Sequence, residues 1–336
     1  MIGSVSKKFT ELRIVFMGTP EFAVGSLDAL LKAGCNIVGV ITAPDKPGGR
    51  GMQLQQSAVK KYAVENNLHV LQPEKLKNPE FLEELKLLKA DLQLVVAFRM
   101  LPEAVWNMPP LGSVNLHGSL LPQYRGAAPI NWAVINGEKE TGVTTFKLKH
   151  EIDTGDILLQ KSFAIEEDDN AGTVHDKMKE IGAALLVKTV KGVAEGTLKE
   201  TLQSSVVISE SSERNQLTTD VSQLTIHNTA LKHAPKIFTE TCTIDWEQTV
   251  DEIYNLIRGL APYPAAFTFL NGRKLKIYKA EKVLSAVVIA IGKYETDEKS
   301  YFRFACKDGY INILELQLEG KKKMPIADFL RGYHFS

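Results

Sequence analysis

Two residues with the chemistry for acyl transfer lie two positions apart in the segment Ser113–Trp132. Asn115 and His117 flank Leu116, and the apolar character of Gly112–Leu116 predicts a short buried strand. Because side chains along a strand alternate faces, Asn115 and His117 should point the same way while Leu116 points into the core. An amide can stabilise a developing oxyanion, and an imidazole can move a proton. The pair therefore indicates an acyl-transfer site.

The residues that follow the pair favour a functional site over simpler roles. An isolated Asn often caps a turn, and an isolated His is often a hydrogen-bonded core residue. Here both residues lie at the predicted end of a strand, before a tight loop that ends at Pro122. A new helix is predicted to begin at Ala128-Pro129, because proline suits the first helical position. This context favours catalysis.

Apolar runs that alternate with helical patterns predict the fold that positions the pair. Continuous apolar runs are typical of parallel strands covered by helices on both faces, so we predict an α/β fold with a doubly wound, mostly parallel, Rossmann-like sheet. The predicted strands are Arg13–Met17, Asn36–Thr42, Leu68–Leu71, Leu92–Phe98, Gly112–Leu116, Gly142–Lys147 and Ile157–Gln160. The predicted helices are Phe22–Gly34, Ser57–Asn66, Glu80–Lys89 and a long helix with Thr173 as its N-cap. Ala43–Gly51 is too rich in Pro and Gly for regular structure.

Two common ligands of such sheets lack support in the sequence. Ligands of doubly wound sheets lie beyond the carboxyl ends of the strands. A dinucleotide fingerprint needs three glycines at fixed offsets, whereas Gly18-Thr19-Pro20 supplies one. His150 and Asp153 have no third metal ligand at a characteristic spacing. We therefore predict neither a Rossmann oxidoreductase nor a bound metal.

The chain is long enough for two domains. Its 336 residues exceed the usual size of one domain, and we place a catalytic domain at 11–203, a linker at 204–232 and a second domain at 233–336. Short strands and the hairpin signal Asn271-Gly272 predict a small OB-like β-barrel in the second domain, a fold often used on nucleic acid. Its predicted strands are Ala266–Leu270, Lys274–Ala280, Val287–Ile291, Tyr301–Ala305 and Ile311–Gln317.

Composition indicates a cytoplasmic globular protein. Forty Lys and Arg balance forty Asp and Glu, so a nucleic-acid surface would have to come from local clusters of charge. Cys35, Cys242 and Cys306 have no metal-like or redox-like spacing, which indicates buried free thiols in a reducing compartment. No apolar run approaches the roughly 18 residues of a membrane span, and the first residues lack the apolar core of a signal peptide.

Five segments match the sequence pattern of a known family. They are Met17–Val24 (MGTPEFAV), Pro44–Gly51 (PDKPGGRG), Asn115–Pro122 (NLHGSLLP), Tyr124–Pro129 (YRGAAP) and Asp153–Asp156 (DTGD). Together they resemble the methionyl-tRNA formyltransferases, a branch of the folate-dependent formyltransferase family. The resemblance extends from about Leu12 into the second domain, where Ile244-Asp245-Trp246 and Pro262-Tyr263-Pro264 also match. The Asn, His and Asp set by itself is shared with formyltransferases and hydrolases that act on other amines.

The resemblance implies the reaction and its catalytic residues. The donor would be the co-substrate 10-formyltetrahydrofolate, and the acceptor the α-amine of Met on initiator tRNA in translation initiation. No obligate protein partner is evident from the sequence. Asn115, His117 and Asp153 match the catalytic set, in which Asp153 would orient the imidazole and stabilise its charged form. Asp156 is the competing aspartate, and side-chain chemistry does not separate the two.

The resemblance also implies the residues that bind folate and tRNA. Ser119, Leu120, Leu121 and Pro122 match the folate-side loop, and Phe98 and Met100 should face the pterin. Lys46 and Arg50 lie in a loop that enters the tRNA acceptor stem in this family. Arg273, Lys274 and Lys276 are further candidates for phosphate contacts, although such hairpin charges are often only solvated surface. Met52-Gln53 replaces basic residues of the relatives, which should weaken the electrostatic contribution of the loop.

Other functions share parts of this pattern. A formyltransferase for an amino-sugar nucleotide would use the same catalytic set and a similar two-domain layout. A purine-pathway formyltransferase would not need the second domain, and a formylfolate hydrolase would use water as the acceptor. The intact set of Asn115, His117 and Asp153 disfavours a catalytically silent RNA-binding module.

Overall fold

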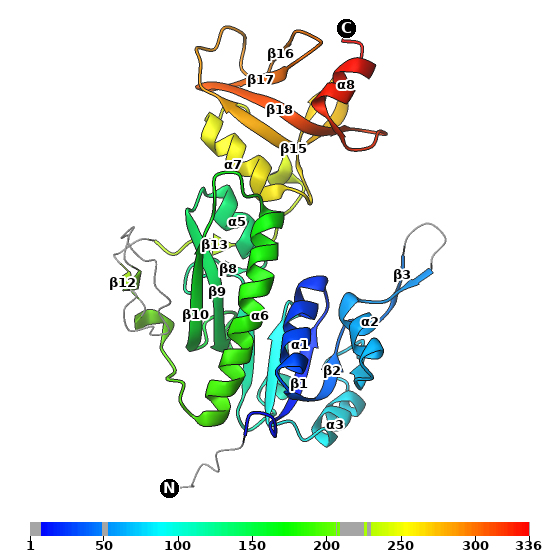
Figure 1. Cartoon of the computed structure of the whole chain (residues 1–336), viewed down its shortest axis with the longest axis vertical. Helices are drawn as coiled ribbons and strands as arrows, with labels where there is room; N and C mark the ends of the chain where they lie inside the picture. The colour runs from blue at the N-terminus through cyan, green and yellow to red at the C-terminus, as the bar shows by residue number, and fades with distance from the viewer. Residues whose placement is uncertain (1–7, 49–52, 206, 209–224, 227–229, 336) are drawn as a thin grey trace. The chain divides into compact units, whose positions relative to one another are not determined.

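The computed structural model describes residues 8–48, 53–205, 207–208, 225–226 and 230–335 (Figure 1). Two compact units make up the chain. The first contains Met1–Arg125, Gly142–Ser162 and Asp176–Lys232, and the second contains Gly126–Thr141, Phe163–His175 and His233–Ser336. The domain boundaries predicted from the sequence, with a linker between residues 203 and 233, stay a prediction.

A seven-stranded sheet organises the first unit, with the strand order β10-β9-β7-β6-β1-β2-β5. The neighbours of β1, β2 and β6 pair in parallel, whereas β9 is antiparallel to β7. These strands are β1 (Arg13–Gly18), β2 (Asn36–Ile41), β5 (Val70–Leu71), β6 (Leu92–Val96), β7 (Ser113–His117), β9 (Glu140–Lys147) and β10 (Ile157–Ala164). The order reverses between β1 and β6, which is the switch point where such sheets bind ligands.

Helices cover both faces of this sheet, so the predicted doubly wound fold is confirmed. On one face α1 (Glu21–Lys32) packs beside α6 (Ala171–Glu195), where Lys179 Nζ lies 3.0 Å from Glu21 Oε1 (Figure 1). On the other face α3 (Pro79–Leu87) and α4 (Glu103–Trp106) contribute Phe81, Leu85 and Val105 to an apolar cluster with strand residues. A further helix, α2 (Ala58–Glu65), begins at its N-cap Ser57.

An antiparallel curled sheet forms most of the second unit, as the fold-class prediction requires. Its order is β14-β15-β18-β17-β16, and β19 pairs with β18. Apolar residues of this sheet and of α7 share one core, and a Thr249–Glu252 capping box begins α7. The elements are α5 (Pro129–Ile135), β13 (His233–Ala234), α7 (Val250–Leu260), β14 (Ala266–Leu270), β15 (Arg273–Val283), β16 (Tyr294–Thr296), β17 (Phe302–Cys306), β18 (Gly309–Leu318), β19 (Met324–Pro325) and α8 (Ile326–Gly332).

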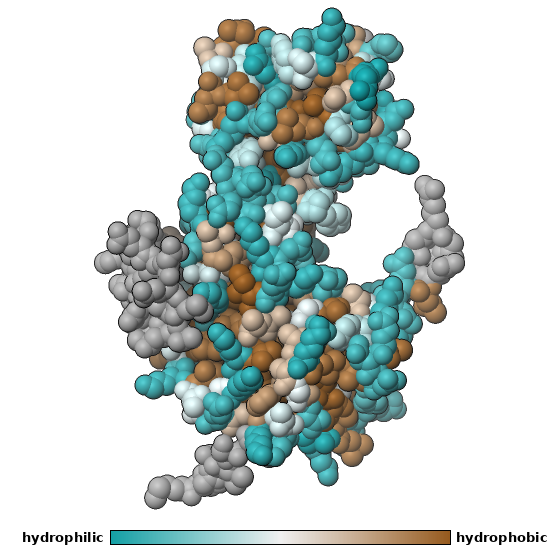
Figure 2. Space-filling view, viewed as in Figure 1, coloured by the Kyte–Doolittle hydropathy of each residue, from teal (hydrophilic) through white to brown (hydrophobic). Residues whose placement is uncertain are grey.

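Short strand pairs and 3-10 turns complete the described elements. They are β3 (Lys46–Gly48) with β4 (Gln53–Gln55), β8 (Arg125–Gly126) with β13, β11 (Val207–Ile208) with β12 (Thr225–Ile226), and 3-10 turns at Gln203–Ser205 and Glu240–Cys242. Large apolar residues such as Leu54 and Leu87 also reach the surface, and Figure 2 shows apolar residues among mostly hydrophilic ones on the face in view.

Three sequence predictions of local structure are wrong. The Pro/Gly-rich segment Ala43–Gly51 does contain regular structure, because Lys46–Gly48 pairs with Gln53–Gln55, and a proline is tolerated on an edge strand. The long helix begins at Ala171, and Asn170 rather than Thr173 caps it, since Asn170 Oδ1 accepts hydrogen bonds from two backbone N–H groups. Val287–Ile291 is not a strand; the N–H of Val288 bonds to the Tyr310 hydroxyl instead.

Candidate active site

Three strand ends converge on the edge of the sheet where the candidate residues lie. β1 ends at Gly18, β6 at Val96 and β7 at His117, and parallel strands present their carboxyl ends at one edge. Gly18 is required there, because a Cβ would lie 2.6 Å from Ala23 Cβ. Asn115 pairs in register with Val95 of β6 and with Phe146 of β9. Leu116 packs on the opposite face, near Gly182 of α6, as the alternation predicted.

The His117 imidazole has a different partner at each nitrogen. Nε2 lies 3.0 Å from the backbone oxygen of Tyr124, and because a carbonyl only accepts, Nε2 carries the hydrogen. Nδ1 is then the nitrogen that accepts or holds a proton, and it faces Asp153 Oδ2 at 3.9 Å. The two side chains are 7% and 11% exposed. The hydrogen bond that orients the ring is therefore the one that Nε2 donates to the Tyr124 oxygen, while the Asp153 carboxylate is placed to stabilise a charged imidazolium.

The competing aspartate has a different partner. Asp156 Oδ2 lies 2.7 Å from Lys149 Nζ, so its charge is balanced by a lysine. Asp153 lies in a turn with a left-handed backbone, at φ 55°. Gly155 must be glycine, because a Cβ would lie 1.6 Å from the backbone oxygen of Lys147. The structure thus brings Asp153 to His117 and Asp156 to Lys149.

The Asn115 side chain is half-buried and available to a ligand. Across residues 8–48, 53–205 and 230–335, no group accepts a hydrogen bond from its amide. A carboxamide N–H at the end of β7, beside an imidazole, suits an oxygen atom that gains negative charge during acyl transfer.

A buried polar network holds the loop Ser119–Pro122. The Thr144 hydroxyl donates to the Ser119 backbone oxygen at 2.7 Å and accepts from the Leu121 N–H at 3.1 Å. Gln160 Nε2 donates to Thr144 Oγ1 at 2.8 Å and to the Leu121 oxygen at 2.9 Å. The Ser119 hydroxyl donates to the Gln123 oxygen at 2.6 Å. Ser119, Leu121 and Pro122 are buried and Leu120 is half-buried, so this loop offers a ligand its backbone and the Leu120 side chain.

Replacing Thr144 by Val tests the predicted role of the loop Ser119–Pro122 in folate binding, and should also lower stability. The change leaves the Leu121 N–H and a Gln160 donor without a partner, and each unpaired buried group destabilises by about 1–3 kcal/mol. We expect a lower Tm and a severalfold higher KM for the folate. Thr145→Val is the matched control, because Thr145 bonds instead to Thr189 at 2.9 Å. Equal KM values in the two variants would contradict the role of the network.

The loop after β6 carries the two residues predicted to face the pterin. Ala97 has a positive φ of 47°, Phe98 is half-buried, and Met100 is 72% exposed. Arg99 holds this loop, since its guanidinium donates to the backbone oxygens of Glu74, at 2.9 Å, and of Pro73. Burial lowers the pKa of Arg99. An exposed thioether beside a half-buried ring is suited to a flat heterocycle.

The hairpin of β3 and β4 carries Lys46, whose side chain is exposed. Arg50 and Met52 lie outside the described residues, and Gln53 begins β4. The base of the hairpin is anchored at Asp45, whose carboxylate accepts from Gln72 Nε2 at 2.8 Å and pairs with Lys60. These hydrogen bonds, from Gln72 first and then from Lys60, lower the pKa of Asp45.

The candidate cations of the second unit do not all lie together. Lys274 and Lys276 pair across the hairpin with Phe269 and Phe267, so these four side chains share one face. Lys274 Nζ lies 4.1 Å from the centroid of the Phe267 ring, and Lys276 Nζ donates to the Pro264 oxygen at 3.0 Å. Arg273 alternates to the other face and donates to the Glu319 oxygen. Phe269 is 56% exposed, so this face combines cations with an open ring.

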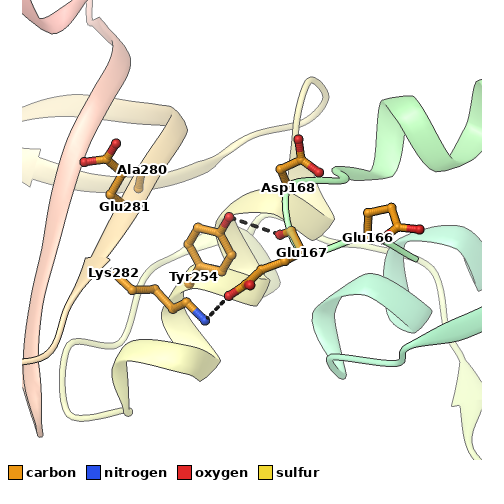
Figure 3. A pocket seen from close by; sticks show the side chains of 7 residues that line it. All are labelled: Glu166, Glu167, Asp168, Tyr254, Ala280, Glu281 and Lys282. Atoms are coloured by element: carbon orange, nitrogen blue, oxygen red, sulfur yellow. Dashed lines mark hydrogen bonds and ion pairs between the residues drawn. The ribbon is translucent and has the colours of Figure 1, made fainter. Parts of the chain in front are cut away.

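A cavity of about 600 Å³ in the second unit is acidic (Figure 3). Glu166, Glu167, Asp168 and Glu281 line it, together with Tyr254, Ala280 and Lys282. Lys282 Nζ lies 2.8 Å from Glu167 Oε1 and 3.0 Å from Asp251 Oδ1, so the lysine charge is already paired. The hydrogen bond from Lys282 lowers the pKa of Glu167. This lining disfavours a phosphate backbone.

The sequence patterns did not predict two residues that shape the site, Tyr124 and Gln203. Tyr124 acts through its backbone oxygen, which no side-chain pattern reports. Gln203 reaches the turn of Asp153 from 50 residues further along the chain. The three cysteines are buried free thiols as predicted, and burial raises the pKa of Cys35 to about 11. Among the described residues, no group of three His, Cys, Asp or Glu could hold a metal, and no helix is long and apolar enough to cross a membrane.

A doubly wound sheet with an amide, an imidazole and a carboxylate near its strand ends is the arrangement expected of a formyl transferase, and two family models show that the chain belongs to this class. The family model for formyl transferase matches residues 12–190, and the model for the formyl transferase C-terminal domain matches residues 236–334. The fold is shared with WlaRD, a sugar 3N-formyl transferase crystallised with dTDP and 5-N-formyl-THF. That alignment has a TM-score of 0.62 and 22% identity, and covers 93% of this chain and 99% of WlaRD.

Comparison with curated relatives shows to which branch of the formyl transferases the chain belongs. The chain is 56% identical to the methionyl-tRNA formyltransferase of Phocaeicola vulgatus and 54% identical to that of Parabacteroides distasonis, in both cases over 332 residues and 97% of each chain. The methionyl-tRNA formyltransferase of Bacteroides fragilis is 50% identical over 98% of this chain and 97% of its own. The chain belongs to the methionyl-tRNA formyltransferase family.

Proposed function

We propose that this enzyme transfers the formyl group of 10-formyltetrahydrofolate to the α-amine of methionyl initiator tRNA, in the cytoplasm. The observation that carries the proposal is the approach of His117 Nδ1 to Asp153 Oδ2, at 3.9 Å, two residues from Asn115. Identity above 50% to methionyl-tRNA formyltransferases over nearly the whole chain supports the acceptor.

His117 and Asp153 handle the proton in the proposed mechanism. The acceptor amine forms a bond to the formyl carbon and must lose a proton, which Nδ1 of His117 accepts. Nε2 keeps its hydrogen on the Tyr124 oxygen throughout, so the ring does not rotate. The Asp153 carboxylate stabilises the imidazolium that forms. The same proton is then available to the nitrogen of the folate as its bond to the formyl carbon breaks, which leaves formylated amine and tetrahydrofolate.

Asn115 handles the negative charge. The formyl oxygen gains charge as the amine adds to the carbon, and the Asn115 amide donates a hydrogen bond to it. The interaction is stronger with the charged oxygen than with the neutral carbonyl, so it lowers the barrier more than it tightens binding.

The proposed folate site lies at the carboxyl ends of β6 and β7. Met100 and Phe98 would contact the ring, and the Ser119–Pro122 backbone with Leu120 would line the other side. Two proteins that share this fold were crystallised with folates, WlaRD with 5-N-formyl-THF and HypX of Aquifex aeolicus with tetrahydrofolic acid.

One assay tests the proposal directly. The enzyme is incubated with formyl-labelled 10-formyltetrahydrofolate and, separately, methionyl initiator tRNA, methionyl elongator tRNA, an amino-sugar nucleotide or water alone. We expect label on the initiator tRNA. Label on the sugar would favour the amino-sugar alternative; WlaRD, a sugar formyl transferase, shares the fold of this chain at 22% identity. Release of free formate would favour a hydrolase.

Binding to tRNA should depend steeply on salt, because phosphate contacts release counterions. Lys274→Ala and Lys276→Ala should each weaken binding and flatten the plot of log affinity against log salt by about 1. Lys86→Ala is the matched control, since Lys86 is 71% exposed on α3 and lies near Glu83. Filter binding from low to high salt measures the slopes. An unchanged slope in both hairpin variants would remove these lysines from the RNA surface.

A further inference from the structure

Gln203 is buried against the turn that carries Asp153, at 4% exposure. Its Nε2 donates to the backbone oxygens of Asp153 and Gly155, each at 2.8 Å. Its Oε1 accepts from Arg125 Nε at 3.0 Å and also from Arg125 Nη2. Both ends of the amide are therefore fully used, and one side chain connects the turn of Asp153 to Arg125.

The turn needs such a restraint. Asp153 has a φ of 55°, a left-handed conformation that is less favourable than helical or extended backbone even though aspartate adopts it more often than most residues, so contacts that hold it stabilise the turn. The close approach of Gly155 to the Lys147 oxygen fixes the far side of the turn. The two Gln203 hydrogen bonds hold the near side, one on each side of Thr154.

The backbone around Gln203 is itself fixed to the sheet. Thr201 and Ile157 exchange two backbone hydrogen bonds, at 2.8 Å and 2.9 Å, which join the segment before the 3-10 turn to β10. Gln203 therefore reaches the turn of Asp153 from a segment that is fixed to the first residue of β10.

Small movements of this turn matter for the chemistry. The distance between His117 Nδ1 and Asp153 Oδ2 is 3.9 Å, with both groups largely shielded from water. Coulomb attraction between partly buried charges falls with distance, and a misplacement of about 1 Å at a catalytic group can lower a rate about 100-fold.

We propose that Gln203, held by Arg125, is a positioning residue that keeps the Asp153 carboxylate beside the His117 imidazole. Its two N–H groups restrain the turn, and the guanidinium sets which end of the amide faces that turn. This inference rests on the proposed formyl transfer, in which Asp153 stabilises the protonated His117.

Two variants of Gln203 remove its hydrogen bonds to the turn in different ways. Gln203→Leu removes every hydrogen bond of the amide. Gln203→Glu keeps an acceptor for Arg125 but replaces the two donors with a carboxylate oxygen that faces two carbonyls. We expect kcat to fall about 10- to 100-fold in both, with KM values for folate and tRNA within about twofold of the wild type. Arg125→Lys, which loses the two-pronged contact, should give a smaller loss of kcat with Gln203 unchanged.

A double-mutant cycle with Asp153→Asn identifies the route of the effect. If Gln203 acts through Asp153, Gln203→Leu lowers kcat in the wild-type background and produces little further loss in Asp153→Asn. Circular dichroism and Tm confirm that each variant is folded, and Arg125→Lys supplies the comparison if Gln203→Leu does not fold.

Two results would overturn the inference: wild-type kcat in folded Gln203→Glu, or the same fold-loss from Gln203→Leu in both backgrounds. Failure of the proposed function is a separate observation, since the wild-type enzyme would then not formylate methionyl-tRNA at all.

Discussion

His117→Ala should lower kcat by about 100- to 10,000-fold, the range typical for loss of a general acid–base group. The imidazole Nδ1 is the proton acceptor in the proposed mechanism, and the neighbouring Tyr124 oxygen and Asp153 carboxylate supply no replacement in the correct place. The proposed folate loop, Ser119–Pro122, is held by Thr144 and Gln160 rather than by His117. Folate affinity should therefore stay near the wild-type value. Single-turnover rates and equilibrium folate binding measure the two quantities separately.

The side chain is 7% exposed, so its removal also leaves a small void and an unpaired carbonyl. His117→Gln addresses this, because its amide can still donate to the Tyr124 oxygen but has no basic nitrogen. We expect it to be nearly as slow as His117→Ala while recovering part of the lost Tm. His69→Ala is the matched control, since His69 is exposed and contributes a backbone oxygen to Val40. A His117→Gln enzyme with near-normal kcat would remove His117 from proton transfer.

The strands of the first unit could be predicted because burial on both faces leaves a strong signal. β1, β2 and β6 are mostly apolar runs, β7 places Val114 and Leu116 in the core between polar residues, and each strand lies within a residue or two of its predicted range. The hairpin of β3 and β4 was missed because its pairing uses only backbone groups, which a Pro/Gly-rich composition conceals. Val287–Ile291 was predicted as a strand but is not one. A run of β-branched residues favours a strand, yet Val288 is 80% exposed.

In the candidate site too, local sequence patterns predicted some residues and missed others. Alternation along β7 placed Asn115 and His117 on one face from their spacing alone. Asp153 entered only through the family resemblance, because its approach to His117 depends on a turn between β9 and β10. Tyr124 and Gln203 act through a backbone oxygen and a long-range side-chain contact, neither of which leaves a periodic pattern. Local sequence patterns therefore predict which side chains of one strand share a face, whereas the residues around them depend on tertiary contacts that the sequence pattern does not show.

Asn115→Ala should lower kcat by about 100- to 1,000-fold, or about 3–4 kcal/mol, the usual effect of removing one donor to an oxyanion. KM values should change little, because the charged oxygen exists only along the reaction path. Asn115 is half-buried and packs in register between Val95 and Phe146, so truncation should lower Tm only slightly. Stopped-flow or quench measurements of formyl transfer, with saturating substrates, give the rate.

Asn115→Asp sharpens this test, because it keeps the size of the side chain and replaces the donor with a negative oxygen. Repulsion of the developing oxyanion should make it at least as slow as Asn115→Ala, whereas a purely structural role for Asn115 would favour the isosteric variant. Asn66→Ala is the matched control, since Asn66 is exposed at the end of α2 and donates to the Tyr62 oxygen. If Asn115→Asp transferred the formyl group faster than Asn115→Ala, the amide would have no part in stabilising the oxyanion. The proposal that Asn115 and His117 act together in formyl transfer would then be wrong.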